Sequence, residues 1–202
     1  MQDEHKVIRL IVPYDVSIPS SSESEIPGGY EVRTRVDVTH RETSTTRPVQ
    51  ATVRLFLQQG SFQIETETVN IDGQRVKMVD SPEEKTLTMT VDDHPPVVVR
   101  AAANGRFEHR GRFYADNQQD NISLSKAIAD QLEESHAQDD SVVANIEAAN
   151  MGRELAARRG PKLFLIPVFV DITTEIKAQM NIQTRRSAPT ARGQNRLRAG
   201  FS

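Results

Sequence analysis

The sequence contains no cysteine and no tryptophan, and aromatic residues make up only 5% of its 202 residues. Without cysteine the chain cannot build disulfide bonds, thiolate zinc sites or a cysteine nucleophile. Its glycines fit neither the Gly-x-Gly-x-x-Gly nor the Gly-x-x-x-x-Gly-Lys pattern, and there is no Gly-x-Ser-x-Gly turn. The common motifs for phosphate binding and for serine hydrolases are therefore absent from the sequence.

Long apolar stretches are also scarce. The longest, at residues 163–170, is well short of the roughly 20 residues with which a helix crosses a bilayer. The N-terminal stretch MQDEHKVIRLIV lacks the basic start and the long apolar core of a secretory signal. We expect a soluble protein that is located in the cytoplasm or in a virion and binds no membrane.

Two stretches combine histidine with acidic residues, namely DDHPP at 92–96 and EESHAQDD at 133–140. Neither has the ligand spacing of a helical zinc pair or of a calcium loop. We therefore expect no metal site, no cofactor, no small-molecule ligand and no catalytic residue. The chain is predicted not to be an enzyme.

Alternation of apolar and polar residues is the dominant pattern from residue 7 to residue 114. In residues 30–39 (YEVRTRVDVT), tyrosine, valine and threonine occupy one set of alternate positions, and charged residues occupy most of the other set. The same alternation recurs in residues 49–57 and 85–91. Strands with one apolar and one polar face are typical of antiparallel sheets.

Turn-forming residues divide this strand region. The pairs Asp72-Gly73 and Asn104-Gly105 tolerate the positive φ angles of a type I′ turn, so each is predicted to close a tight hairpin. Residues 19–29 (PSSSESEIPGG) are polar and show no period, which predicts a surface loop.

A two-helix insert is predicted at about residues 120–160. Asp120 or Asn121 can cap the first helix, which carries apolar residues at helical spacing. The stretch DDS at 139–141 can cap the second helix, which is predicted to end at Arg159 before a Gly-Pro pair.

A long strand is predicted at residues 168–183. At about 3.3 Å per residue this strand would extend about 53 Å, whereas a compact domain of this length has a diameter of about 43 Å. The strand must therefore bend at a bulge or project to another subunit, and the sequence leaves both alternatives open. Its apolar face supplies four candidate inter-subunit residues: Ile172, Ile176, Met180 and Ile182.

Together these patterns predict a mainly β fold within the β-rich α+β class. We expect an antiparallel sandwich or barrel-like pair of sheets with the two-helix insert and a long C-terminal strand. Residues 1–183 are predicted to form a single β-rich domain, and residues 184–202 a basic C-terminal arm.

The arm carries five arginines and no acidic residue. Removing its charge of +5 from the net charge of −3 leaves −8 on residues 1–183, so opposite charges are segregated along the chain. We expect the arm to pair with carboxylates of a neighbouring subunit, although phosphate binding and simple disorder are alternatives. The candidate inter-subunit residues of the arm are Arg185, Arg186, Arg192, Arg196, Arg198 and Phe201.

The stretch RFEHRGRFY, residues 106–114, interleaves arginine with aromatic residues. If it forms one strand, Arg106, Arg110 and Arg112 share one face, and the aromatic residues lie on the other. This arginine face is a candidate nucleic-acid contact.

The function that these observations favour is a non-enzymatic structural subunit of a repeating assembly. A virion component, such as a phage capsid, tail-tube or connector protein held by strand and arm exchange between subunits, is the preferred class. Its partners would be copies of itself or other structural subunits. The alternative is a nucleic-acid-binding protein that uses the arm and the 106–112 arginine face.

Overall fold

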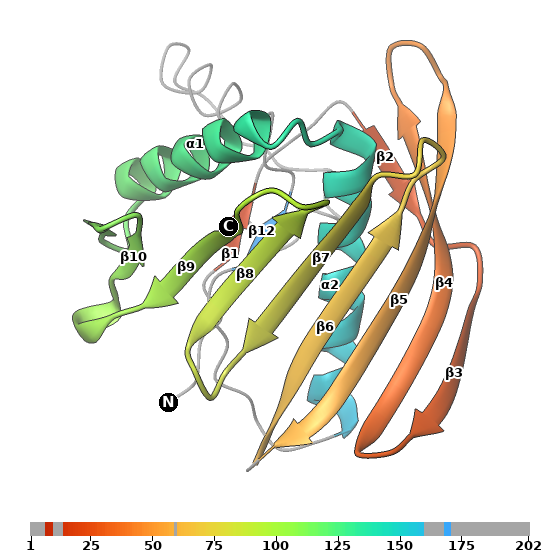
Figure 1. Cartoon of the computed structure of the whole chain (residues 1–202), viewed down its shortest axis with the longest axis horizontal. Coiled ribbons are helices and arrows are strands. Elements are labelled where there is room, and N and C mark those ends of the chain that lie inside the picture. Colours follow the sequence, from red (N-terminus) through yellow and green to blue (C-terminus); the bar gives the residue numbers. More distant parts are fainter. Residues whose placement is uncertain (1–6, 10–13, 59, 160–167, 171–202) are drawn as a thin grey trace.

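The structure is a computed structural model and describes residues 7–9, 14–58, 60–159 and 168–170. Its main element is an antiparallel sheet of ten strands that is open and not closed into a barrel (Figure 1). Most strands follow one another as hairpins, so the spatial order is β11-β10-β9-β8-β7-β6-β5-β4, with β2 and β3 both pairing with β4. The strands are β2 (Tyr14–Ser17), β3 (Ser21–Ile26), β4 (Gly29–His40), β5 (Thr46–Gln58), β6 (Ser61–Val69), β7 (Arg75–Ser81), β8 (Thr86–Val91), β9 (Val97–Ala101), β10 (Phe107–His109) and β11 (Arg112–Tyr114).

Two α-helices, a 3-10 turn at Ala103–Gly105 and a second, small sheet complete the described structure. Helix α1 (Gln118–Glu134) and helix α2 (Asp139–Arg159) cover one face of the large sheet (Figure 1). Strands β1 (Val7–Arg9) and β12 (Val168–Val170) form a two-stranded parallel sheet, and β12 lies against α2. The predicted mainly β class, its antiparallel sheet and the two-helix insert are thus confirmed.

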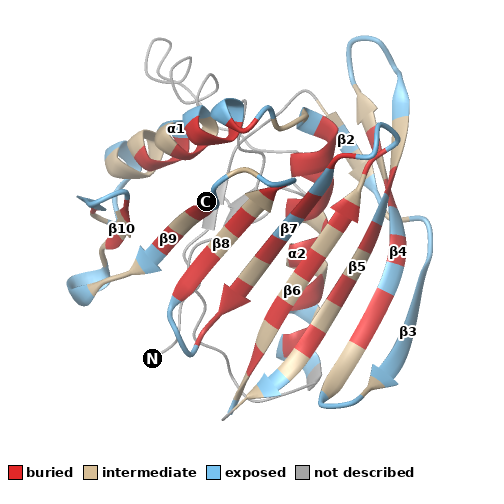
Figure 2. Ribbon diagram, in the orientation of Figure 1, coloured by how far each residue is buried: buried red, intermediate tan, exposed pale blue. Residues whose placement is uncertain are grey.

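The period-two pattern of the sequence determines which face of each strand is buried. In β4, Val32, Val36 and Val38 are buried in a cluster with residues of α2, whereas Arg33 and Arg35 are exposed. Figure 2 shows the same alternation of buried and less buried residues along β5, β6 and β7. The opposite face of the sheet is rich in charged and hydroxyl side chains, as expected for an antiparallel sheet with one face toward solvent.

Helix α2 approaches the sheet closely because small residues recur on it at every fourth position. These residues are all buried: Ala144, Ala148, Gly152 and Ala156. A Cβ atom added at Gly152 would lie only 2.7 Å from Cγ1 of Val53 on β5. Positions four apart lie on one face of a helix, so this stripe sets the short distance between α2 and the sheet.

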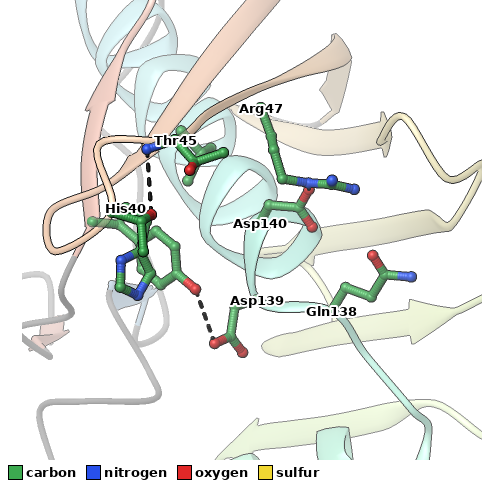
Figure 3. A pocket seen from close by; sticks show the side chains of 9 residues that line it. His40, Thr45, Arg47, Gln138, Asp139 and Asp140 are labelled. Atoms are coloured by element: carbon green, nitrogen blue, oxygen red, sulfur yellow. Dashed lines mark hydrogen bonds and ion pairs between the residues drawn. The ribbon is translucent and has the colours of Figure 1, made fainter.

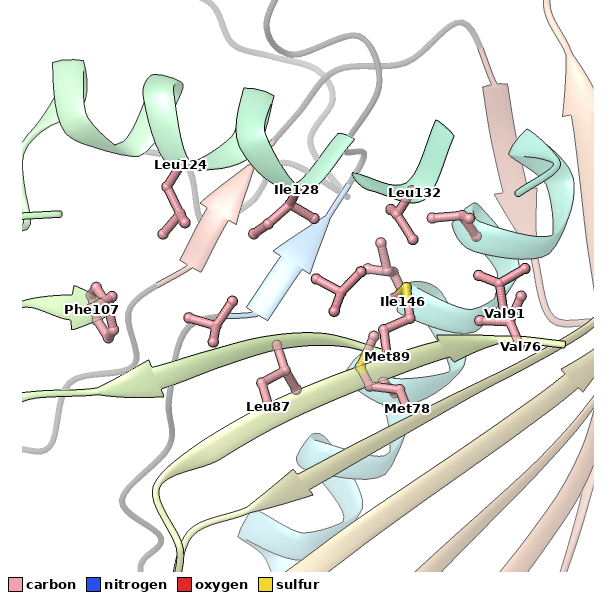
Figure 4. Close-up of a cluster of buried hydrophobic side chains, with 14 of the residues drawn as sticks. Val76, Met78, Leu87, Met89, Val91, Phe107, Leu124, Ile128, Leu132 and Ile146 are labelled. Atoms are coloured by element: carbon pink, nitrogen blue, oxygen red, sulfur yellow. The ribbon is translucent and has the colours of Figure 1, made fainter. Parts of the chain in front are cut away.

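The buried residues form two clusters that share α2. The α1-side cluster contains large side chains from α1 and from β7 to β11, among them Leu124, Ile128 and Phe107 (Figure 4). The β4–β6 cluster consists mainly of valine, leucine and isoleucine from the strands and of alanine from α2.

A buried ion pair lies close to both clusters. Asp80 of β7 is opposite Ile64 of the β4–β6 cluster on one side and opposite Leu87 of the α1-side cluster on the other. Its carboxylate is 2.6 Å from the guanidinium of Arg153 on α2, and the side chains are only 1% and 7% exposed. The pair therefore links the centre of the sheet to α2 within the core.

Several local predictions need correction. The predicted loop at 19–29 contains strand β3, and its hairpin with β4 turns at Pro27-Gly28, where Gly28 has a φ of 83°. Because β3 lies at the edge of the sheet, its side chains bury little surface, and its sequence does not alternate between apolar and polar residues.

The N-cap of α1 is Asn117, which lies three residues before the predicted Asp120. The Asn117 side chain accepts a hydrogen bond from the backbone N–H of Asp120. Asp120 lies within the first turn, where its negative charge still favours the helix N-terminus. Helix α2 ends at Arg159, as predicted, but it begins at Asp139, so the residues predicted to cap it lie in its first turn.

Both predicted hairpins exist, but only one has the predicted turn. Asn104 and Gly105 both have positive φ angles and connect β9 to β10 in a tight turn. The Asp72-Gly73 pair instead lies in a longer loop between β6 and β7, where only Gly73 has a positive φ. Asn70 at the start of this loop accepts from the N–H of Gln74, which stabilises the wider turn.

Candidate functional site

The β1–β12 sheet brings together segments from near the two ends of the sequence. Val7 lies opposite Val168, and Arg9 lies opposite Val170. Within the described residues each of these strands has one neighbour, so each has one edge without a strand partner there. Parallel strands normally occur in larger, covered sheets, and a two-stranded sheet by itself has little stability.

In the ten-stranded sheet, by contrast, the edge strands β3 and β11 have features that resist further pairing. On β3, Glu23 and Glu25 lie opposite Val32 and Tyr30, so acidic residues occupy the positions that face inward on the neighbouring strand. Charged residues at inward positions are a known protection of edge strands. Strand β11, at the other edge, is only three residues long. The β1–β12 sheet is composed of Val-Ile-Arg and Val-Phe-Val and lacks such acidic residues.

The 106–114 stretch forms a hairpin, which overturns the prediction of one strand. Arg110 and Gly111 both have positive φ angles and turn the chain between β10 and β11. The three arginines of the predicted face are therefore separated. Arg110 pairs with Glu134 of α1 at 3.3 Å, and the guanidinium of Arg112 lies 5.0 Å from the ring centre of buried Tyr114.

The same hairpin creates a different grouping on the outer face. Phe113 lies opposite Glu108, which in turn lies opposite Arg100 on β9. The guanidinium of Arg106 is 4.6 Å from the ring centre of Phe113, whose side chain is 49% exposed. An exposed aromatic ring beside an arginine, with a second arginine two strands away that pairs with Glu108 at 3.5 Å, is an arrangement that the one-strand prediction had separated.

A pocket of about 490 Å³ lies at the corner between β2, the β4–β5 turn and the start of α2 (Figure 3). The ring of Tyr14 meets the ring of His40 edge to face, with 5.0 Å between the ring centres. The Tyr14 hydroxyl donates a hydrogen bond to Oδ2 of Asp139 at 3.2 Å. Partial burial, followed by the negative charge of Asp139, raises the pKa of Tyr14 to about 12.

The wall of the pocket formed by β5 and α2 is held by a network around Arg47. Its Nε atom is 2.6 Å from Asp140, and its terminal nitrogen is 2.7 Å from Asp72. The hydrogen bond to Asp140 is the main cause that raises the pKa of Arg47 above its usual value. Asn70 donates to the other oxygen of Asp140 and to the side chain of Gln138. This network fixes the β6–β7 loop and the start of α2 against β5.

The candidate inter-subunit residues of the predicted C-terminal strand and arm lie outside the described residues. The structure therefore describes none of these side chains: Ile172, Ile176, Met180, Ile182, Arg185, Arg186, Arg192, Arg196, Arg198 and Phe201. Of the predicted strand at 168–183, the described part is β12.

Sequence reasoning missed two groupings for different reasons. Gly111 is a turn signal that could have divided the 106–114 stretch and placed Phe113 beside Arg106. The pocket has no comparable signal, because Tyr14, His40 and Asp139 come from three elements that are distant in the sequence.

In the ranges that the structure describes, no three His, Asp or Glu side chains are grouped so that they could hold a metal ion. No helix of the described part is both long and apolar enough to cross a bilayer. No protein-family model matches the chain, and no curated protein or solved structure matches it either.

Proposed function

We propose that this protein is a structural subunit of a repeating assembly, and that the assembly is a virion component. The observation that carries the proposal is the two-stranded parallel sheet of β1 and β12. In the assembly, β1 of one copy pairs with β12 of the next copy, in the register that the single chain shows.

Strand exchange of this kind is energetically inexpensive because the same contacts form within a chain and between chains. Backbone donors and acceptors on the outer edges of β1 and β12 are also suited to further strands. The acidic positions of β3 and the short β11 disfavour growth through the large sheet. Assembly through the small sheet is the route that these edges support.

The absence of cysteine from the chain allows a direct test. Val7→Cys and Val168→Cys are made as separate variants with tags of different size, mixed, and oxidised. Neighbouring strands are about 4.8 Å apart, a separation that a disulfide tolerates. We expect disulfide-linked pairs of the two variants at concentrations where light scattering shows an assembly.

The matched control replaces Val168→Cys with Glu84→Cys, an exposed position in the loop between β7 and β8. This mixture should give only a background of linked chains. A wild-type chain that remains monomeric over the whole concentration range, with no excess of linked Val7–Val168 pairs, would rule out the proposed assembly.

A second candidate function is binding of single-stranded nucleic acid on the outer face of β9 to β11. It rests on the exposed Phe113 ring beside Arg106, with Arg100 two strands away, where it pairs with Glu108 at 3.5 Å. Aromatic stacking contributes about 1–3 kcal/mol per base, and the arginines would neutralise phosphates. Fluorescence anisotropy with a labelled oligonucleotide tests it, with Phe113→Ala as the variant and Leu57→Ala, another exposed apolar residue, as the control. Equal binding by both variants would reject this site.

A further inference from the structure

We propose that the pocket formed by Tyr14, His40 and Asp139 receives an arginine side chain from residues 184–202 of a second copy of the chain. This inference rests on the proposed assembly and names the surface to which the arm binds.

The shape and lining of the pocket fit a guanidinium group. Its volume of about 490 Å³ is within the range of pockets that hold small ligands. The rings of Tyr14 and His40 form an aromatic wall, and Asp139 supplies a carboxylate next to it (Figure 3). A guanidinium can stack on an aromatic face while it donates hydrogen bonds to a carboxylate, which a compact ammonium group does less well.

The charges around the pocket also favour a cation. Of the side chains that line the pocket, Asp139 and Asp140 carry two negative charges, and Arg47 carries one positive charge that contacts Asp140 directly. These three side chains together carry a net charge of −1. Oδ2 of Asp139 accepts a hydrogen bond from the Tyr14 hydroxyl. An ionised carboxylate can accept further hydrogen bonds, so Asp139 can also bind a guanidinium.

The arm is the matching partner on grounds of charge and residue type. It contains five arginines and no acidic residue, whereas residues 1–183 carry a net charge of −8. Opposite charges on two parts of the same chain favour contacts between copies without any third component. Small residues beside the arginines, as in SAPTARG at 187–193, would let the backbone approach the pocket.

The experiment uses a fluorescently labelled peptide with the sequence TRRSAPTARGQNRLRAGFS and the full-length chain. We expect Asp139→Asn to weaken peptide binding by about fivefold, the upper end for a partly exposed ion pair. The matched control is Asp93→Asn, which removes an equal charge from the exposed turn between β8 and β9 and should leave binding unchanged. A peptide with glutamine in place of every arginine should not bind.

A second variant separates the pocket from general electrostatic attraction. Thr45→Trp fills the pocket from its rim without changing any charge, so it should weaken binding at least as much as Asp139→Asn. If Thr45→Trp binds the peptide normally, or if the two asparagine variants weaken binding equally, the pocket is not the site.

Light scattering on the same samples distinguishes this inference from the proposed function. If the assembly forms normally but neither Asp139→Asn nor Thr45→Trp weakens peptide binding, the pocket is rejected and the assembly is not. A wild-type chain that stays monomeric at every concentration rejects the assembly, and with it a second copy as the source of the arginine.

Discussion

The two clusters of the core meet the same helix in different ways. On the β4–β6 side, alanine and glycine bring α2 close to the strands, and the space is filled by branched side chains of the sheet. On the α1 side, leucine, isoleucine, methionine and phenylalanine fill a wider gap between helices and sheet. The first side should therefore be sensitive to added volume, and the second to volume removed.

The largest expected effect concerns the ion pair that lies close to both clusters. Asp80→Asn leaves the Arg153 guanidinium buried without a charged partner, so we expect a loss of about 3–5 kcal/mol in the free energy of unfolding. Denaturant unfolding measures this loss of stability. The double variant Asp80→Leu/Arg153→Met should recover most of the loss, and a single variant that unfolds like the wild type would show that the pair is dispensable.

On the α1 side, Ile128→Ala removes a fully buried side chain from the helix that covers the larger gap. We expect a loss of about 2–5 kcal/mol, because rigid neighbours such as Leu124 and Leu132 cannot close the cavity completely. Lys126→Ala, on the exposed face of the same helix, should change stability by less than about 0.5 kcal/mol. Thermal melts of the two variants provide the comparison.

On the β4–β6 side, Gly152→Ala adds one methyl group where the nearest atom, Cγ1 of Val53, would be 2.7 Å away. Alanine stabilises a helix interior by about 1 kcal/mol relative to glycine. Any net loss in the free energy of unfolding would therefore come from the clash. We expect a net loss of about 1–3 kcal/mol. The clash should be relieved in Gly152→Ala/Val53→Ala, so the two substitutions should be non-additive. Simple additivity would mean that α2 can shift away from the sheet.

The smallest expected effect concerns the polar face of the large sheet, which contributes to neither core cluster. The hydrogen bond from Arg33, with a further one from Arg54, holds the pKa of Glu31 below its usual value. A lowered folded pKa contributes stability above the unfolded pKa, near 4.3, and loses it as pH falls through the folded pKa. Glu31→Gln should thus lower stability at pH 7 by less than about 1 kcal/mol. The difference from wild type should shrink as the pH falls and vanish below the folded pKa of Glu31, where the carboxyl is protonated. A difference that persists there would have a cause other than ionisation.

The sequence by itself determined the elements whose signal is local and periodic. Alternation in β4, β5 and β8 identified these strands and their buried faces, because a strand buried on one side must place apolar residues at every second position. The start and end of α2 followed from its acidic first turn and the Gly-Pro pair after Arg159. The Asn104-Gly105 turn was readable because few residues tolerate its positive φ angles.

Only the tertiary structure decided the features that depend on contacts between distant segments. The apolar pattern of α2 does not reveal that position 152 needs a glycine to leave room for Val53. That need comes from the short distance between the helix and the sheet. The pairing of β1 with β12 and the pocket of Tyr14, His40 and Asp139 join residues more than a hundred positions apart. Such contacts form because chain closure and burial of the whole core bring the segments together, and no local propensity encodes them.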